Sequence, residues 1–208
     1  MMNIYLIRHG QTDWNIQGRI QGSHDIPLNE TGLMQAQMLA EGMESKPVKK
    51  IFSSTLKRAL ATAEALSSRQ QAEIIPMPQL IEMEFGKWEG LTWEEIEEKY
   101  PKEYRHWVLN PSEAAPPGGE SQDQIIKRCM EVLHIIVEQT GGREDIAVVS
   151  HGGILAWLVS VMLGPDVQEE SIIVENASIT TVHYSPLTEI FTVLERNDTS
   201  HIKKGKLI

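Results

Sequence analysis

Strand-like and helix-like patterns alternate along this chain, and the alternation limits its fold more than any other feature of the sequence. The strand-like segments are 3–7, 50–53, 73–77, 145–150, 179–184 and 190–194. The helix-like segments, with apolar residues at helical spacing, are 31–44, 55–67, 121–138 and 152–163, and two shorter ones are 92–99 and 102–108. Such alternation predicts an α/β fold in which a mainly parallel central sheet is flanked by helices on both faces.

The chain length of 208 residues suits one compact domain. No repeat, linker or low-complexity tract divides the sequence, so we expect a single domain over residues 1–208, with a small helical excursion at about 85–119. Ser121 follows a Pro-Pro-Gly-Gly stretch and is a natural helix N-cap, and Thr31 and Thr55 are candidates for the same role.

The chain is acidic, with a net charge of −10, which argues against nucleic-acid binding because that depends on basic surfaces. An anionic substrate would need a local cluster of positive groups that overrides the overall field. No segment approaches the roughly 20 consecutive apolar residues of a membrane span, and the N-terminus lacks the pattern of a secretion signal. We therefore expect a soluble cytoplasmic protein with no nucleic-acid or membrane partner, and the oligomeric state stays open.

The single cysteine, Cys129, excludes an internal disulfide and a cysteine-rich zinc site. It falls on the apolar stripe of the 121–138 segment, which favours a small buried residue over a nucleophile.

Two histidines, each followed by glycine, stand at the carboxyl ends of two expected strands. His9-Gly10 follows the first strand and His151-Gly152 follows the fourth. In an open α/β sheet, sites lie beyond this edge. Glycine has no Cβ, so its backbone N–H can approach a ligand closely. The helix that begins near Gly152 also offers N–H groups and the positive end of its dipole to a phosphate.

Two arginines have placements that stability alone does not explain. Arg58 falls in the first turn after the second strand, where a cation opposes the helix dipole. Arg8 is a charged residue directly after an apolar strand. A guanidinium group can bind two phosphate oxygens at once. In a regular strand Arg8 and His9 would point to opposite faces, so both reach one ligand only if the chain turns at Gly10.

These positions belong to a set of longer motifs that run in order along nearly the whole chain. The motifs are Arg8-His9-Gly10-Gln11-Thr12-Asp13-Trp14-Asn15, residues 18–22, 25–32, 53–59 with Thr62-Ala63, residues 82–90, and Ser150-His151-Gly152-Gly153. Together they closely resemble the signature of the histidine phosphatase superfamily, the phosphoglycerate mutase-like fold.

The resemblance implies a role for each matching residue. It implies that His9 is the nucleophile, that Glu82 is the proton donor, and that the phosphoryl group is held by Arg8, Arg58 and His151. It also implies pocket positions that bind the substrate, namely Asn15, Gln21, Gly22 and Gly152. Neither a metal nor a cofactor is implied, and the expected partner is a small phosphorylated substrate.

The chemistry of these side chains agrees with the implied roles. A neutral imidazole nitrogen can attack phosphorus without first losing a proton. Fixed cations stabilise the charge on the phosphoryl oxygens in the transition state. A carboxylic acid at Glu82 can protonate the leaving oxygen and then, as carboxylate, deprotonate the attacking water. We expect no chemical part for the neighbouring Glu84 and Glu89, and we interpret most of the other histidines as structural or surface residues.

The activity is predicted to be phosphomonoester hydrolysis through a phosphohistidine, and several alternatives stay open. A phosphoglycerate mutase is less favoured because the acid is followed by Phe85-Gly86-Lys87-Trp88-Glu89-Gly90-Leu91-Thr92 rather than by the Tyr-Gly-x-Leu-x-Gly-Leu-Asn-Lys stretch of such mutases. An α-ribazole phosphatase and a catalytically silent binding module of the same fold are further alternatives. The motifs of metallophosphatases, nucleotide-binding loops and serine hydrolases are absent from the sequence. The aromatic residues of the excursion could form an apolar lid or pack its two short helices together.

Overall fold

Six strands form one mixed sheet in the computed structural model, which describes residues 1–110, 113–164 and 174–204. The strands are β1 Met2–Arg8, β2 Lys50–Ser53, β3 Glu73–Pro76, β4 Ile146–Ser150, β5 Ile179–Ser185 and β6 Ile190–Asp198. Their order in the sheet is β3-β2-β4-β1-β5-β6. The pairs from β3 to β1 are parallel, and β5 and β6 are antiparallel to their neighbours. The expectation of a mainly parallel sheet is therefore confirmed.

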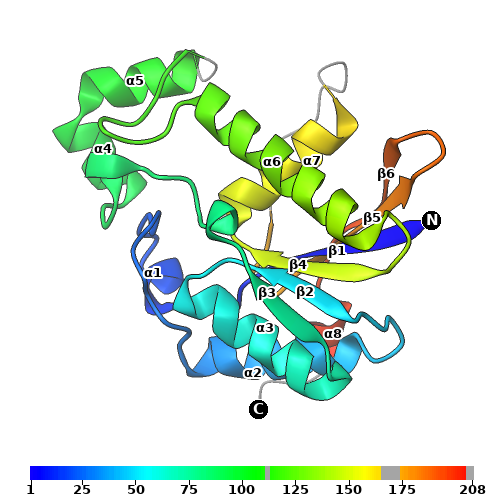
Figure 1. The fold of residues 1–208 in the computed structure, drawn as a ribbon. Helices are drawn as coiled ribbons and strands as arrows, with labels where there is room; N and C mark the ends of the chain where they lie inside the picture. The colour runs from blue at the N-terminus through cyan, green and yellow to red at the C-terminus, as the bar shows by residue number, and fades with distance from the viewer. Residues whose placement is uncertain (111–112, 165–173, 205–208) are drawn as a thin grey trace.

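Helices cover both faces of this sheet (Figure 1). They are α1 Asp13–Ile16, α2 Glu30–Gly42, α3 Lys57–Gln70, α4 Trp93–Lys99, α5 Pro101–Leu109, α6 Gln122–Thr140, α7 Gly152–Leu163 and α8 Ser200–Lys204, with short 3-10 turns η1 Pro78–Leu80 and η2 Gly86–Trp88. Figure 1 shows α6 and α7 on one side of the sheet and α2, α3 and α8 on the other. Within the described ranges, no helix is long and apolar enough to cross a membrane.

The side chains of β1 alternate between the two layers of the core, because successive residues of a strand point to opposite faces. Ile4 and Leu6 pack with the apolar residues of α6 and α7. Tyr5 and Ile7 pack with those of α2 and α3. Burial on both faces explains why this strand is a continuous apolar run in the sequence.

Side-chain caps mark the starts of some helices, and two of the three expected caps were wrong. Ser121 caps α6 as predicted, by accepting a hydrogen bond from the backbone N–H of Gln124. Helix α2, however, is capped by Asn29, whose Oδ1 accepts from Gly32 N at 2.8 Å, so Thr31 lies inside the first turn. Helix α3 begins after Leu56 without a side-chain cap, so Thr55 does not serve as one.

The elements that the sequence did not indicate are short or polar. Four-residue α1 and the two 3-10 turns contain too few residues to show a hydrophobic period. Strand β6 continues past the expected end at residue 194 to Asp198, because its polar part still pairs with β5. The two short helices expected in the excursion are present as α4 and α5.

The aromatic residues of the excursion pack against one another. Trp88 is fully buried, and its ring centroid lies 6.3 Å from that of Trp93 and 5.7 Å from that of Trp107, both edge-on. Edge-on pairs are a favourable arrangement of aromatic rings. Trp88 and Trp107 form a small core with Ile20 and Ile96, and this core holds α4 and α5 on η2.

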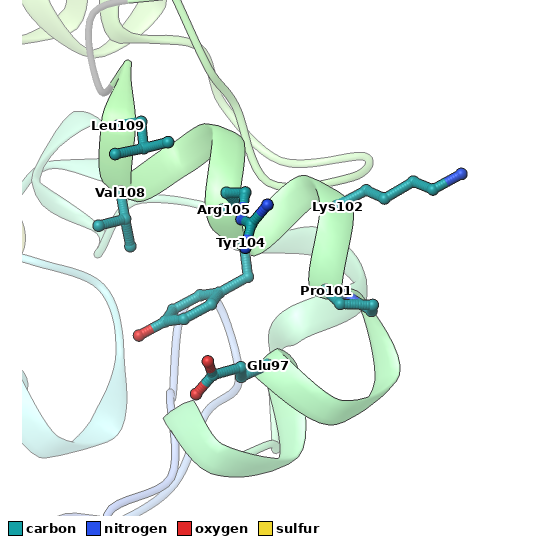
Figure 2. A pocket seen from close by; sticks show the side chains of 7 residues that line it. All are labelled: Glu97, Pro101, Lys102, Tyr104, Arg105, Val108 and Leu109. Carbon is teal, nitrogen blue, oxygen red and sulfur yellow. The ribbon is translucent and has the colours of Figure 1, made fainter.

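The outer surface of α4 and α5 carries a hollow of about 740 Å³. Its lining residues are Glu97, Pro101, Lys102, Tyr104, Arg105, Val108 and Leu109 (Figure 2). None of them belongs to the set of site residues expected from the sequence.

The turn that follows β1 lies directly against the first turn of α2. A Cβ on Gly10 would come within 2.5 Å of Gly32 O, and a Cβ on Gly32 would come within 2.1 Å of Gln11 O. Both distances are shorter than real Cβ contacts, so only glycine fits at either position. The carbonyl of Gln11 also accepts a hydrogen bond from Asn29 N at 3.0 Å. The start of α2 therefore fixes the turn that carries His9.

We expect Gly32→Ala to destabilise the protein although it places a better helix former inside α2. Helix propensity favours alanine by about 1 kcal/mol. The clash with the Gln11 carbonyl should outweigh this gain, so that the unfolding free energy falls by about 1–3 kcal/mol in total. Urea unfolding measures the difference. Gln37→Ala, at an exposed position of the same helix, should stay within about 0.5 kcal/mol of the parent. An unfolding free energy for Gly32→Ala at or above that of the parent would contradict the close approach.

Candidate active site

The carboxyl ends of three neighbouring strands meet at one edge of the sheet. Strand β4 lies between β2 and β1, and the backbone pairing continues past the strand ends. His9 N donates to Ser150 O at 3.0 Å, and Ser54 N donates to Val149 O at 2.9 Å. The ring centroids of His9 and His151 are 5.1 Å apart. The two histidines expected at strand ends thus lie side by side.

His9 is a neutral imidazole with a defined tautomer. Its Nδ1 lies 2.6 Å from Gly10 O. A carbonyl oxygen can only accept, so Nδ1 carries the proton and Nε2 carries the lone pair. Burial lowers the pKa of His9 well below its usual value, and the charges of Arg8 and Arg58 lower it further. The ring is therefore unprotonated at Nε2 at neutral pH.

His151 is neutral as well and has the opposite tautomer. Arg58 Nε donates to His151 Nδ1 at 3.1 Å, and Nε2 lies 2.8 Å from Ser54 Oγ. Because a guanidinium group only donates, Nδ1 is the acceptor and Nε2 bears the hydrogen. Burial lowers the pKa of His151 well below its usual value, and the nearby His9 and Arg58 add to the effect. Both ring nitrogens have protein partners, so a phosphoryl oxygen would have to replace Ser54.

Arg58 is fully buried and held on three sides. Besides His151, its partners are His24 O, 2.5 Å from Nη1, and Gly22 O, 2.9 Å from Nη2. Burial lowers the pKa of Arg58 to about 10, so it keeps its positive charge at neutral pH. Gly22 has φ +49, and a Cβ there would meet the Glu89 carboxylate at 2.1 Å, so this position favours glycine.

Arg8 has an unsatisfied donor at the site. Its Nη1 donates to Val174 O, whereas its Nε has no hydrogen-bond partner among the residues that the structure describes. Burial lowers the pKa of Arg8, and the Glu82 charge acts in the opposite direction. A buried guanidinium N–H without a partner is costly unless a ligand satisfies it, which suits an anion.

Glu82 occupies the N-terminus of α7. Its carboxylate accepts from Gly153 N and Ile154 N, each at 3.1 Å, and from Met83 N at 3.0 Å. Two of the helix N–H groups that were expected to face a phosphate, those of Gly153 and Ile154, are therefore taken by the acidic side chain. Gly152 lies beside Arg8, since a Cβ there would be 3.5 Å from Arg8 Nε.

A cavity of about 150 Å³ joins most of these side chains. It is lined by Arg8, His9, Asn15, Arg19, Ile20, Gln21, Gly22, Arg58, Glu82 and Phe85. Of the expected site residues, His151 and Gly152 do not line this cavity. Three arginines and one glutamate give the cavity a local positive charge in an acidic protein, as an anionic substrate requires.

The sequence assigned no role to three of the lining residues, Arg19, Ile20 and Phe85. Arg19 is anchored to the excursion, because its Nη1 donates to Gly90 O at 2.6 Å and to Glu95 Oε2 at 3.0 Å. Arg19 and Ile20 stand in the same short motif as Gln21, and this spacing was the available signal. Phe85 lies in the motif that begins at Glu82.

The two expected pocket amides have different surroundings. Asn15 Oδ1 accepts from Thr12 N and Thr12 Oγ1, both at 3.0 Å, and from Asn176 Nδ2 at 3.2 Å. Gln21 is 8% exposed, and its Oε1 has no partner in the described part of the chain. That acceptor is free to receive a donor from a bound molecule.

The neighbouring Glu89 has a structural role. Its carboxylate accepts from Phe85 N and Ser23 Oγ, both at 3.0 Å, and it pairs with His24 Nδ1 at 2.7 Å. It thereby joins the acid segment to the 22–24 loop. Cys129 is buried in the core, and burial raises its pKa to about 12, which fits a small packed residue. In residues 1–110, 113–164 and 174–204 no group of three or more His, Cys, Asp or Glu side chains is placed to hold a metal ion.

Comparison with known proteins gives consistent relatives. Phosphoserine phosphatase 1 of Hydrogenobacter thermophilus is 32% identical over 203 residues, 97% of this chain and 95% of the relative. Metal-independent phosphoserine phosphatase of Arabidopsis thaliana is 43% identical over 156 residues, 73% of this chain and 65% of the relative. A probable phosphoglycerate mutase, GpmB of Cronobacter sakazakii, is 33% identical over 97% of this chain and 95% of its own.

The fold has solved counterparts. A phosphoserine phosphatase mutant from Entamoeba histolytica, crystallised in complex with phosphoserine, superposes with a TM-score of 0.84 and 28% identity, covering 97% of this chain and all of that one. The family model described as Histidine phosphatase superfamily (branch 1) matches residues 4–199. The chain therefore belongs to the histidine phosphatase superfamily (branch 1), and its two strand-end histidines and the arginines Arg8 and Arg58 are in place.

Proposed function

We propose that this chain is a phosphomonoester hydrolase that passes the phosphoryl group of a small metabolite to His9 and then to water. The observation that carries the proposal is the Nδ1–H hydrogen bond from His9 to Gly10 O. It leaves Nε2 as a lone-pair nitrogen on a ring whose cavity is also lined by three arginines, Arg8 and Arg58 among them, and by the Glu82 carboxyl group. A neutral nucleophile, fixed cations and a proton donor are the groups that phosphoryl transfer requires.

In the first step, Nε2 of His9 forms a bond to phosphorus as the ester P–O bond breaks. Glu82, in its protonated form, gives its proton to the departing oxygen, which leaves as an alcohol. The charge on the phosphoryl oxygens is stabilised by Arg8 and Arg58. The phosphorylated ring is cationic, and its Nδ1–H remains bonded to Gly10 O.

In the second step, the Glu82 carboxylate takes a proton from water, whose oxygen attacks phosphorus. The P–N bond breaks, inorganic phosphate leaves, and His9 returns to its neutral form with Glu82 protonated again. The two guanidinium groups supply the charge that a metal ion supplies in other phosphatases. The name of the Arabidopsis relative supports metal independence.

Phosphoserine is the first substrate to test, because two relatives and two solved neighbours are named for it. Phosphoglycerates and α-ribazole phosphate remain alternatives of the same chemical class. A mutase activity has one observation in its favour, the similarity to a probable phosphoglycerate mutase. Against it stands the segment after Glu82, which lacks the stretch typical of those mutases.

His9 should become covalently phosphorylated during turnover, because Nδ1 is bonded to Gly10 O and Nε2 keeps the lone pair. Alkaline quenching followed by intact-mass and peptide mapping should place the phosphoryl group on His9. His9→Ala should lower the rate at least about 10³-fold, since the covalent route is lost. His134→Ala, a matched control at an exposed helix position, should leave the rate unchanged. A phosphopeptide that excludes His9 would overturn the assignment.

Glu82→Gln should lower the rate by roughly 10²–10⁴-fold for an ester with a poor leaving group, because the proton donor is lost. For para-nitrophenyl phosphate, whose leaving group needs little protonation, phosphorylation of His9 should be much less affected. Rapid-quench measurement of the first step compares the two substrates. Glu84→Gln, at an exposed neighbouring position, is the control. Equal losses with both substrates would mean that Glu82 is not the acid.

The purified protein should release phosphate from simple phosphomonoesters, in EDTA as in buffer, with little isomerisation of phosphoglycerate. Inorganic phosphate and 2-phosphoglycerate are followed together, with 3-phosphoglycerate as substrate and with or without 2,3-bisphosphoglycerate. Phosphoserine and α-ribazole phosphate complete the panel. Isomerisation that depends on the bisphosphate and outpaces phosphate release on every ester would favour the mutase. Activity lost in EDTA and restored by a divalent ion would overturn metal independence.

A further inference from the structure

The segment before β5 returns to the turn that carries His9. Asn176 Nδ2 lies 3.1 Å from His9 O, 3.2 Å from Gly10 O and 3.2 Å from Asn15 Oδ1. The next residue, Ala177, donates from its backbone N–H to His9 O at 3.1 Å. One amide side chain therefore joins the backbone of the nucleophile to a residue of the cavity wall.

The backbone next to Asn176 is strained. Ala177 is fully buried and has φ 54, in the left-handed region that residues other than glycine rarely adopt. Strain of this kind persists where the surrounding contacts hold it, and it is concentrated at functional sites. The conformation brings both the Asn176 amide and the Ala177 N–H to the same carbonyl group.

The carbonyl oxygen of Gly10 accepts hydrogen bonds from two side chains. One is Nδ1–H of His9, and the other is the amide of Asn176. Gly10 is a residue whose backbone turns easily, so its carbonyl needs fixed partners to keep one direction. The peptide that follows is also held at its N–H, where Gln35 Oε1 accepts from Gln11 N at 2.8 Å. Asn176 is the side chain that holds the carbonyl end.

We propose that Asn176 is a positioning residue for the nucleophile: it holds the Gly10 carbonyl in the direction that keeps His9 in the Nδ1–H tautomer. Asn176 does not line the cavity of His9 and Glu82 but a neighbouring hollow beside Arg8, so it acts through Gly10 and Asn15. Without it, the carbonyl can turn and the ring can place its proton on Nε2, where the lone pair is needed. The inference rests on the proposed role of His9.

The test compares Asn176→Leu and Asn176→Asp, which are close to asparagine in size and lack its amide N–H groups. Each should lower kcat by at least about 10-fold, as the loss of an outer partner that orients a histidine does. Nitrogen NMR of histidine-labelled protein should show His9 as Nδ1–H in the parent and partly as Nε2–H in the variants. Asn110→Leu, at an exposed position, is the control.

Unchanged kcat in a folded variant would overturn the proposal, and so would a lower kcat with the His9 tautomer unaltered. If Asn176→Leu does not fold, Asn176→Asp provides the test, because aspartate has the same shape as asparagine. The proposed function fails separately, when the parent protein gives no phosphohistidine. A parent that is phosphorylated on His9 while both Asn176 variants keep kcat and tautomer would sink this inference alone.

Discussion

Two guanidinium groups at one edge of the sheet, that of Arg58 fully buried and that of Arg8 partly buried, determine much of the structure around them. Removing an ion from water costs several kcal/mol even after relaxation, so Arg8 and Arg58 need acceptors from several directions. The chain supplies carbonyl groups for this purpose: those of Gly22 and His24 to one arginine and that of Val174 to the other. The loop 22–24 and the segment before β5 are therefore tied to the two cations through their backbone carbonyls. Among the residues that the structure describes, Arg8 Nε has no acceptor, and this N–H can bind an anion.

The same two cations explain the state of the histidines. A positive charge nearby disfavours a second one, and burial acts in the same direction, so both rings are neutral. Their neighbours then decide the tautomers. A carbonyl beside His9 Nδ1 and a guanidinium beside His151 Nδ1 force opposite proton positions on two rings that nearly touch. His9 keeps a lone pair at Nε2 and His151 keeps a hydrogen there. His9 is therefore suited to attack phosphorus, and His151 is suited to donate a hydrogen bond.

The sequence predicted those parts of the site that depend on local patterns of residues. Short, continuous apolar runs located β1, β2 and β4, and with them the edge where His9, His151 and Arg58 meet. It was silent where contacts join distant segments. The carboxylate of Glu82 on the N-terminus of α7 and the amide of Asn176 on His9 O span 71 and 167 residues, and no periodicity carries such information. The start of α2 was misplaced for a related reason: Asn29 serves as its cap, while its backbone N–H also bonds to Gln11.

The contact of Gly10 with Gly32 makes α2 a mechanical support for the nucleophile. Backbone rests on backbone there, with no side chain to yield between the two. At the far end of α2 a Cβ on Gly42 would meet His201 Cβ at 2.6 Å, so α8 closes on the helix as tightly as the His9 turn does. Helix α2 is thus in close contact at both of its ends, with the His9 turn at one and with α8 at the other. Substitutions on the solvent-exposed face of α2 should therefore be tolerated. An insertion that lengthened the helix, or a shift along its axis, would displace the turn that carries His9.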